Sequence, residues 1–260
     1  KLLLERFPKL WSRMGFNAKM VTRNLMRNKG RSITSLVGVL CCTMLIITST
    51  GLQESVAYSV GLYYKGTLAY SARANLTGSV GTAESYEKRI DAQRVETVMD
   101  KTVSIRTAEK SRTTTLTVLQ DDQQLLLLGP DNVWMPLPET GVVLSQKLAQ
   151  YLNAGVGDAV RLWLAGDDEA IVTTVSAIAP IDIGLIAFMG RSQWEGFRKG
   201  EFTPSAILLL NPTERGIETV DALDELDSWE YPEQQYLDTM TVLDAVTGVF
   251  KLMFFIALGL

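Results

Sequence analysis

The sequence has 260 residues, with 25 Lys and Arg, 29 Asp and Glu, two Cys and no His, and a formal net charge of −4. The absence of histidine excludes Ser-His-Asp and Cys-His nucleophile pairs, imidazole metal sites and histidine general bases. Cys41 and Cys42 are adjacent, so no framework of long-range disulfides is available. The chain starts at Lys1 rather than Met and stops within an apolar run, and we therefore expect a fragment of a longer protein.

Residues 1–31 form a basic arm. Nine bases and one acid, Glu5, give the arm a formal charge of +8, so the rest of the chain carries −12. Apolar residues recur there with the spacing of one helix face: Leu10, Met14, Ala18, Val21 and Leu25. Because Gly15 interrupts this pattern, we expect Asn17 to cap a helix that starts at residue 18.

A basic amphipathic helix of this kind is expected to lie on the anionic cytoplasmic leaflet of a membrane. Its charges could serve only to set the membrane topology, or they could also form a surface for a partner protein. Nucleic acid is not an expected partner, because the large remainder of the chain is acidic.

Residues 32–53 contain no charged residue. As an α-helix, 22 residues at ~1.5 Å each span roughly 33 Å, close to the ~30 Å hydrocarbon thickness of a bilayer. Serine and threonine hydroxyls in this stretch can bond back to helix carbonyls. We therefore predict a transmembrane helix, rather than a buried core helix or a cleavable signal peptide, whose basic and apolar regions would be shorter. The positive-inside rule places residues 1–31 in the cytoplasm and residues 54–244 outside it.

Ser35, Gly38 and Cys42 recur at spacings of three and four in this helix and place small side chains on one face. Such a face permits close helix–helix packing in lipid, although ordinary scatter of small residues would give the same pattern. Cys41 and Cys42 are expected to be packing residues, because hydrocarbon disfavours the reactive thiolate.

Residues 54–244 are expected to form a mixed α+β domain with its own core. The membrane helix should continue through residues 58–70 and bend at Gly61 or Gly66. The remaining expected elements are helices over residues 86–99, 145–152, 192–199 and 213–227, and strands over residues 113–118, 125–128, 141–144, 159–164, 170–178, 183–189 and 206–210. Ser145 is a suitable N-cap for the second of these helices, and residues 153–155 supply a left-handed C-cap.

Residues 245–260 are apolar except for Lys251. We expect them to form the start of a second transmembrane helix, with Lys251 at the outer interface. The alternative is a C-terminal core helix of a soluble domain. The expected fold class is therefore α+β: a transmembrane helix, a mixed α+β extracytoplasmic domain and the start of a second transmembrane helix.

No catalytic, cofactor-binding or metal-binding constellation is predicted. Gly155 and Gly157 lack the third glycine of a dinucleotide-binding loop, and no phosphate-binding loop is present. Acidic clusters at residues 121–122 and 167–169 lack the spacing of a calcium loop. Ser145 and Lys147 are two residues apart, which is the wrong spacing for a nucleophile and its base on one helix face.

Residues 20–32, Met-Val-Thr-Arg-Asn-Leu-Met-Arg-Asn-Lys-Gly-Arg-Ser, followed by a helix that contains Gly-Val-Leu, resemble the start of FtsX/MacB-like permease modules of bacterial ABC transporters. Residues 3–11 are similar to the connector before the second module of large permeases. Residues 141–149 with Val-Gly-Asp at 156–158 resemble the strand, helix and turn of the family's outer domain. Residues 175–178 and 188–189 fit its later strands.

The resemblance implies a multi-pass protein of the bacterial plasma membrane with no ATPase activity of its own. Such a permease pairs with a separate ATP-binding cassette ATPase subunit and with other permease helices or a second permease copy. Nucleotide-driven closure of the ATPase would move the outer domain by mechanotransmission, for export or extraction of a peptide, lipid-linked or amphipathic substrate.

The resemblance also assigns membrane-surface or ATPase contact to a set of residues before the first membrane helix: Arg23, Asn24, Arg27, Asn28, Lys29 and Arg31. Two other functional classes remain open at this point. One is a membrane-anchored extracytoplasmic sensor that signals without transport, and the other is a membrane-tethered hydrolase of the cell envelope.

Overall fold

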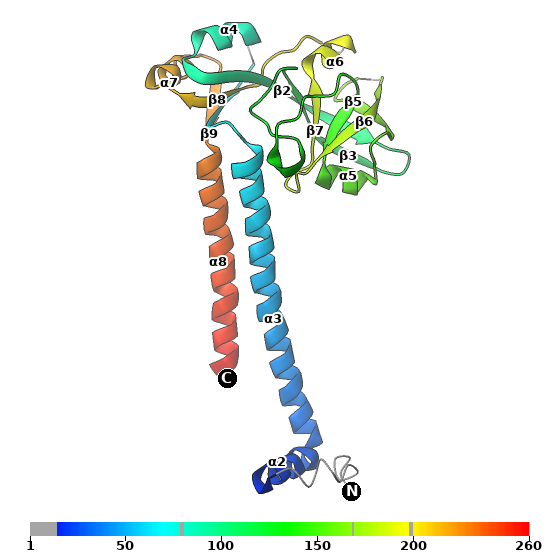
Figure 1. The fold of residues 1–260 in the computed structure, drawn as a ribbon, viewed down its shortest axis with the longest axis vertical. Helices are drawn as coiled ribbons and strands as arrows, with labels where there is room; N and C mark the ends of the chain where they lie inside the picture. The colour runs from blue at the N-terminus through cyan, green and yellow to red at the C-terminus, as the bar shows by residue number, and fades with distance from the viewer. Residues whose placement is uncertain (1–14, 79–80, 168, 198–199, 260) are drawn as a thin grey trace. The chain divides into compact units, whose positions relative to one another are not determined.

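The computed structural model describes residues 15–259 except 79–80, 168 and 198–199 (Figure 1). The chain divides into two compact units. We call Lys1–Ser55 with Leu243–Leu260 the helical unit, and Val56–Val242 the α+β unit. The latter contains a nine-stranded sheet with helices, and the predicted mixed α+β class is confirmed. The expectations for Leu10 and Met14 lie outside the described residues.

The helical unit begins with helix α2, Phe16–Arg27, which is followed by α3, Lys29–Gly61 (Figure 1). The expected cap at Asn17 is wrong. Gly15 occupies the N-cap position with extended φ and ψ of −65° and 163°, and no side chain caps the helix. Gly15 thus starts this helix instead of interrupting a longer one, because glycine is an acceptable N-cap.

Helix α3 is 33 residues long and contains the whole charge-free stretch. Among the described residues, one helical segment, Lys29–Thr67, is long and apolar enough to cross a membrane. The hydroxyls of Thr34 and Thr43 donate to the carbonyls of Gly30 and Val39, so the predicted back-bonding is confirmed at both threonines.

The C-terminal helix α8, Pro232–Gly259, begins well before the expected residue 245. Proline is suited to the first helical position, where its missing N–H is not needed. The polar residues ahead of the apolar run did not predict helix, but Gln234 and Asp238 hydrogen-bond across one turn at 2.9 Å and support it.

The sheet of the α+β unit has the strand order β3-β7-β4-β6-β5-β2-β8-β1-β9, and an additional pairing of β3 with β2. This pairing closes β3, β7, β4, β6, β5 and β2 into a six-stranded barrel, which we call the barrel lobe. Its strands are β2 (Ala92–Arg106), β3 (Ser111–Leu119), β4 (Val142–Ser145), β5 (Ala159–Leu164), β6 (Ile171–Ala179) and β7 (Ile186–Gly190).

The barrel lobe is filled by apolar side chains and carries two short helices. Helix α5, Gln146–Leu152, packs on β4 and β6, and α6, Arg191–Gly196, packs on β7 and β3. The predicted signals around α5 are confirmed, because the Ser145 hydroxyl accepts from the Leu148 N–H and Asn153 adopts left-handed φ and ψ of 53° and 44°. The expected strands over residues 159–164 and 170–178 are present as β5 and β6, and they pair antiparallel.

The remaining strands form a second lobe, which we call the sheet lobe. The first half of β2 pairs with β8, β8 with β1, and β1 with β9, all antiparallel. Its elements outside β2 are β1 (Ala72–Leu76), α4 (Ala83–Arg89), β8 (Ala206–Pro212), α7 (Glu214–Asp221) and β9 (Leu226–Glu230). Tyr86, Ile207 and Val220 are fully buried in the core of this lobe.

Two helices expected from the sequence are wrong over part of their length. The helix over residues 86–99 ends at Arg89, and β2 follows it, because β-branched residues such as Val95, Thr97 and Val98 pair with β8. The helix over residues 213–227 ends at Asp221, and residues 226–230 instead pair with β1.

The strand expected over residues 125–128 is also wrong. Only a single bridge joins Leu126 to Leu68. The buried carboxylate of Glu96 accepts from the N–H groups of Gln124 at 2.7 Å and Leu125 at 3.3 Å. The backbone of Leu125 and Leu127 bonds to Ala69 and Thr67 around the single bridge, so this segment does not form a strand ladder.

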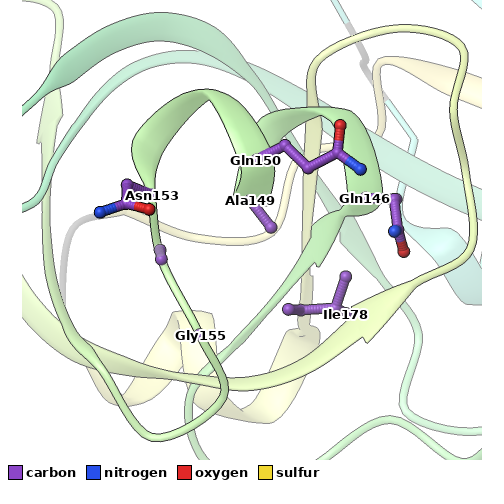
Figure 2. A pocket seen from close by; sticks show the side chains of 7 residues that line it. Gln146, Ala149, Gln150, Asn153, Gly155 and Ile178 are labelled. Atoms are coloured by element: carbon purple, nitrogen blue, oxygen red, sulfur yellow. The ribbon is translucent and has the colours of Figure 1, made fainter.

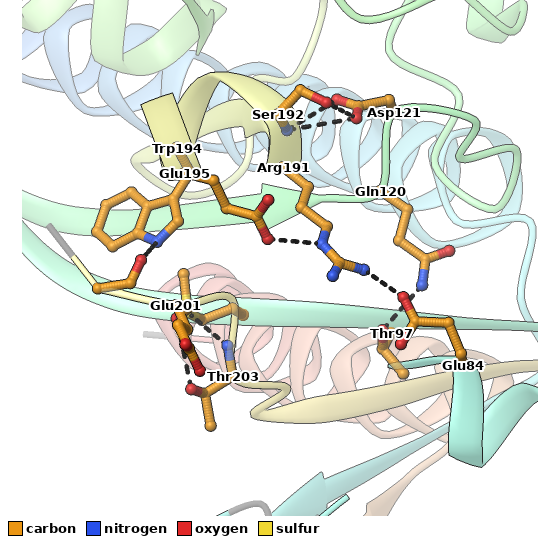
Figure 3. A network of polar contacts seen from close by, with 12 residues as sticks. Glu84, Thr97, Gln120, Asp121, Arg191, Ser192, Trp194, Glu195, Glu201 and Thr203 are labelled. Carbon is orange, nitrogen blue, oxygen red and sulfur yellow. Dashed lines mark hydrogen bonds and ion pairs between the residues drawn. The ribbon is translucent and has the colours of Figure 1, made fainter. Parts of the chain in front are cut away.

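A polar network joins the two lobes (Figure 3). Arg191 on α6 donates to Glu84 on α4 and to Glu195 on its own helix, each at 2.9 Å. The Gln120 amide donates to Glu87 at 2.6 Å. These bonds fix α4 of the sheet lobe against α6 and the end of β3.

Candidate functional site

The basic residues predicted to contact the membrane or an ATPase lie around the junction of α2 and α3. Asn24 and Arg27 belong to α2, Asn28 joins the helices, and Lys29 and Arg31 belong to the first turn of α3; all five are exposed. Arg23 also belongs to α2, but its side chain lies outside the described residues. Contact of these residues with a membrane or an ATPase stays a prediction.

The structure brings three of the predicted residues together. Asn28 has φ and ψ of −113° and 53°, which break the helix between α2 and α3. Asn24, Asn28 and Arg31 line a hollow of about 410 Å³ in the angle so formed. Arg27 and Lys29 do not line it.

The cations of this junction are available to an external anion. Within the described part of the chain, neither Arg27, Lys29 nor Arg31 forms an ion pair. On α2, Phe16 is 80% exposed and Met20 is 56% exposed. Exposed apolar side chains beside unpaired cations are typical of a helix that lies in a membrane interface.

The small-residue face of α3 is only partly covered within the helical unit. Ser35 and Gly38 are exposed, and a Cβ added to Gly38 would have no atom within 4 Å. Cys42 is half-buried. Helix packing through these residues stays a prediction. Three turns beyond Cys42 and on the same side, the Gln53 amide donates to the Asp244 carboxylate of α8 at 3.1 Å. No local signal predicts this pair, although Gln53 is the single amide in the charge-free stretch.

The α+β unit begins with a change of helix type at Gly61. Residues Leu62–Thr67 form a π-helix, η2, so the predicted break at Gly61 or Gly66 corresponds to the start of a wider helix. The Lys65 ammonium lies 3.9 Å from the centroid of the Tyr236 ring of α8. This contact connects the segment that follows α3 to the helix that leaves the unit.

A half-buried ionic network lies just beyond η2, and we call it the Arg73 network. Arg73 on β1 pairs with Asp100 on β2 at 2.5 Å, and the Thr117 hydroxyl of β3 donates to the same carboxylate at 2.6 Å. Arg73 also donates to Asn75, whose amide donates to Glu230 of β9 at 2.8 Å. The network therefore joins β1, β2, β3 and β9.

Burial and charge define the electrostatics of the Arg73 network. Burial lowers the pKa of the Arg73 guanidinium, but the charge and hydrogen bond of Asp100 raise it by more. The pKa of Arg73 therefore lies above its ordinary value. Burial raises the pKa of the neighbouring Tyr70 phenol, which therefore stays protonated. These residues can hold the strands together when force acts on them, and they do not form an acid–base or nucleophile–base pair.

In the residues that the structure describes, no three His, Cys, Asp or Glu side chains are arranged to hold a metal ion. Two candidate functional regions therefore remain. They are the α2–α3 junction, and η2 together with the Arg73 network. The sequence located the first and missed the second, because Arg73, Asp100 and Glu230 are scattered over more than 150 positions.

No protein-family model and no curated protein matches the chain. Among solved structures, it is similar to the periplasmic region of MacB from Actinobacillus actinomycetemcomitans, with a TM-score of 0.45 and 12% identity over 67% of this chain and 94% of the other. It is also similar to the extracellular domain of the noncanonic ABC-type transporter YknZ from Gram-positive bacteria, with a TM-score of 0.38 and 9% identity over 62% of this chain and 98% of that domain.

A third similar structure is a domain from Porphyromonas gingivalis described as part of a permease, with a TM-score of 0.36 and 14% identity over 56% of this chain and 76% of that domain.

Proposed function

We propose that the chain is part of the permease subunit of a bacterial ABC transporter. A separate ATPase would drive the spanning helices, and these would move the α+β unit outside the cytoplasm to export or extract a peptide, lipid-linked or amphipathic substrate. The observation that carries the proposal is α3, an exposed helix that runs from a basic arm to the α+β unit and contains 22 uncharged residues.

The exposed side chains of α3 support a place in lipid. Val39, Leu45 and Ile47 are 65%, 68% and 67% exposed. Burying a side chain of this kind is worth about 1.5–3 kcal/mol, so leaving many of them in water would oppose folding. In a bilayer the same surface is solvated by acyl chains, and the backbone groups are satisfied within the helix.

The charges around α3 support an orientation. The arm carries +8 and the chain beyond it −12, and the positive-inside rule places the basic side in the cytoplasm. In that orientation the α2–α3 junction faces the compartment that contains ATP. Arg27, Lys29 and Arg31 would then contact the membrane surface or the ATPase.

The α+β unit supplies a route by which helix motion could reach an outer surface. The π-helix η2 continues directly from α3, and its Lys65 contacts Tyr236 on α8. The Arg73 network begins six residues after the end of η2. It connects β1, the strand that follows η2, to β9, the strand that precedes α8. A sensor that signals through the same helices would share this route. The identity of the partner protein therefore distinguishes the two functions.

The proposal is tested by co-purification from membranes. The full-length protein is expressed with the ATP-binding cassette protein encoded beside it, and recovery of the ATPase is measured for the wild type and for Arg27→Glu with Arg31→Glu. We expect at least fivefold lower recovery for the double variant. Lys88→Glu with Arg89→Glu, which reverses two exposed charges on α4, serves as the matched control and should recover the wild-type amount.

Two outcomes would contradict the proposal. One is the absence of any ATP-binding cassette protein in complexes of the wild type. The other is ATP hydrolysis by the purified chain alone at a rate that the partner does not change.

A further inference from the structure

The exposed side of α5 borders a polar groove in the barrel lobe. This groove has a volume of about 530 Å³ and is formed by the start of β3, by α5 and by the loop before β7. Two cations, Arg112 and Lys147, line it together with Tyr151, Asp182 and Leu185. Acidic residues outnumber cations beyond the basic arm, where the chain carries −12.

Both cations are unpaired. Within the described part of the chain, neither Arg112 nor Lys147 forms an ion pair, and both are exposed. The guanidinium of Arg112 lies 5.2 Å from the centroid of the Tyr151 ring. A cation–π contact of this kind holds a guanidinium in place and leaves N–H donors free, so Arg112 is positioned to bind an anion with little loss of side-chain entropy.

The balance of charges favours an anion with a single charge. Asp182 lines the same groove and opposes one of the two cations. At the tip of the β2–β3 hairpin, Lys110 lies 5.9 Å from the Tyr151 ring, while Glu109 accepts from the Asn153 amide at 3.3 Å. These two charges cancel, and the groove has a local charge of +1. A carboxylate matches this charge better than a phosphate dianion does.

A second hollow also borders α5 (Figure 2). It has a volume of about 270 Å³ and includes the amide side chains of Gln146, Gln150 and Asn153. Ala149 and Ile178 point toward each other across it and form an apolar floor (Figure 2). Side-chain amides offer one acceptor and two donors each, which is the pattern that pairs with a ligand amide.

Gln150 lines both hollows, so the cationic groove and the amide-lined hollow meet at this residue. We propose that together they bind an amido carboxylate, a ligand in which an amide lies next to a carboxylate. Arg112 and Lys147 bind the carboxylate, Gln150 and Gln146 bind the amide, and Leu185 contacts an apolar side chain. This chemistry has two sources, a free N-acyl amino acid and the C-terminal residue of a peptide.

The inference does not depend on the proposed transport function, because it concerns binding to the α+β unit alone. Its test uses the purified full-length protein in nanodiscs and measures the Kd of N-acetyl-leucine by isothermal titration calorimetry. N-acetyl-leucine amide, which lacks the negative charge, is the matched ligand control, and we expect it to bind at least tenfold more weakly.

Variants locate the site. Arg112→Gln and Lys147→Gln should each weaken binding of N-acetyl-leucine about tenfold, and Asp182→Asn should tighten it severalfold, because it removes the opposing charge. Lys88→Gln, which removes an exposed cation on α4, should leave the Kd unchanged. Melting temperatures are compared with the wild type, and Lys147→Gln provides an independent measurement if Arg112→Gln does not fold.

An acetylated tetrapeptide that ends in leucine distinguishes the two sources. Equal or tighter binding than N-acetyl-leucine identifies a peptide C-terminus as the ligand, and tenfold weaker binding identifies the small molecule; both outcomes support the site. Equal binding of the acid and the amide would overturn it. So would tighter binding of inorganic phosphate than of N-acetyl-leucine, or wild-type affinity in both Arg112→Gln and Lys147→Gln.

Discussion

Replacement of Arg73 by methionine should destabilise the α+β unit measurably. The side chains of Arg73 and Asp100 are 21% and 25% exposed, so their pair lies between two limits. Exposed pairs are worth about 0–1 kcal/mol, and breaking a fully buried pair costs about 3–5 kcal/mol. We expect about 2 kcal/mol for Arg73→Met, because Asp100 keeps the Thr117 hydroxyl as a donor but loses its charged partner.

For a unit of this size, about 2 kcal/mol corresponds to a fall in Tm of about 4–8 °C. The assay is a thermal melt of the full-length protein followed by tryptophan fluorescence, which Trp163, Trp194 and Trp229 report from within the α+β unit. Arg215→Met on α7 removes an exposed arginine as a control, and its Tm should stay within about 2 °C of the wild type.

A double-mutant cycle with Asp100→Asn separates the pair from the general effects of substitution. We expect a coupling energy of about 1–2 kcal/mol, so that Arg73→Met costs little once Asp100 is neutral. A fall in Tm no larger than that of Arg215→Met, or strictly additive single variants, would refute the view that this ion pair joins the strands.

Two further predictions concern stability. Gly141→Ala should lower the free energy of unfolding in urea by about 2–4 kcal/mol, because the φ of Gly141 is +91° and the new Cβ would lie 1.7 Å from the Ser176 hydroxyl oxygen. Gly157→Ala, at φ +94° in open space, should lower it by only about 1 kcal/mol. Equal losses in the two variants would contradict the predicted clash at Gly141. The Glu84 carboxyl has its pKa lowered by its own backbone N–H and by Arg191. Its stabilising effect is therefore present above the ordinary carboxyl pKa and is lost as the pH falls through the lowered pKa. The Tm difference between wild type and Glu84→Gln should shrink as the pH falls from neutral through the carboxyl range, and a difference that stays constant over that range would argue against this linkage.

The parts of the fold that the sequence predicted depend on local signals. Around α5, Ser145 supplies a cap hydroxyl and Asn153 tolerates the left-handed region, so both helix ends could be placed from residue type alone. The charge-free stretch predicted α3 in the same way, since its length and composition exclude most alternatives.

The parts that it missed depend on pairing between distant segments. Strand β2 contains charges interleaved with apolar residues and fits a helix equally well, and only its neighbours β3, β5 and β8 make it a strand. The closure of the barrel depends on the parallel pairing of β3 with β7 across about 70 residues. Local propensity contains no information about such pairs.

The same limit applies to the candidate sites. The basic arm is contiguous, so its composition shows it directly. Lys65 and Tyr236, by contrast, are 171 positions apart and meet only because η2 and α8 lie side by side in the folded unit. The groove beside α5 is assembled from residues of β3, α5 and a loop, none of which forms a recognisable motif alone.

The central claim is the position of α3 in a membrane, and site-directed labelling tests it most directly. Asn17→Cys and Glu109→Cys are introduced singly after both native cysteines have been replaced by alanine, and intact spheroplasts are treated with a membrane-impermeant maleimide. We predict rapid labelling at position 109 and labelling at position 17 only after permeabilisation. Equal labelling of both positions in intact spheroplasts would contradict the account.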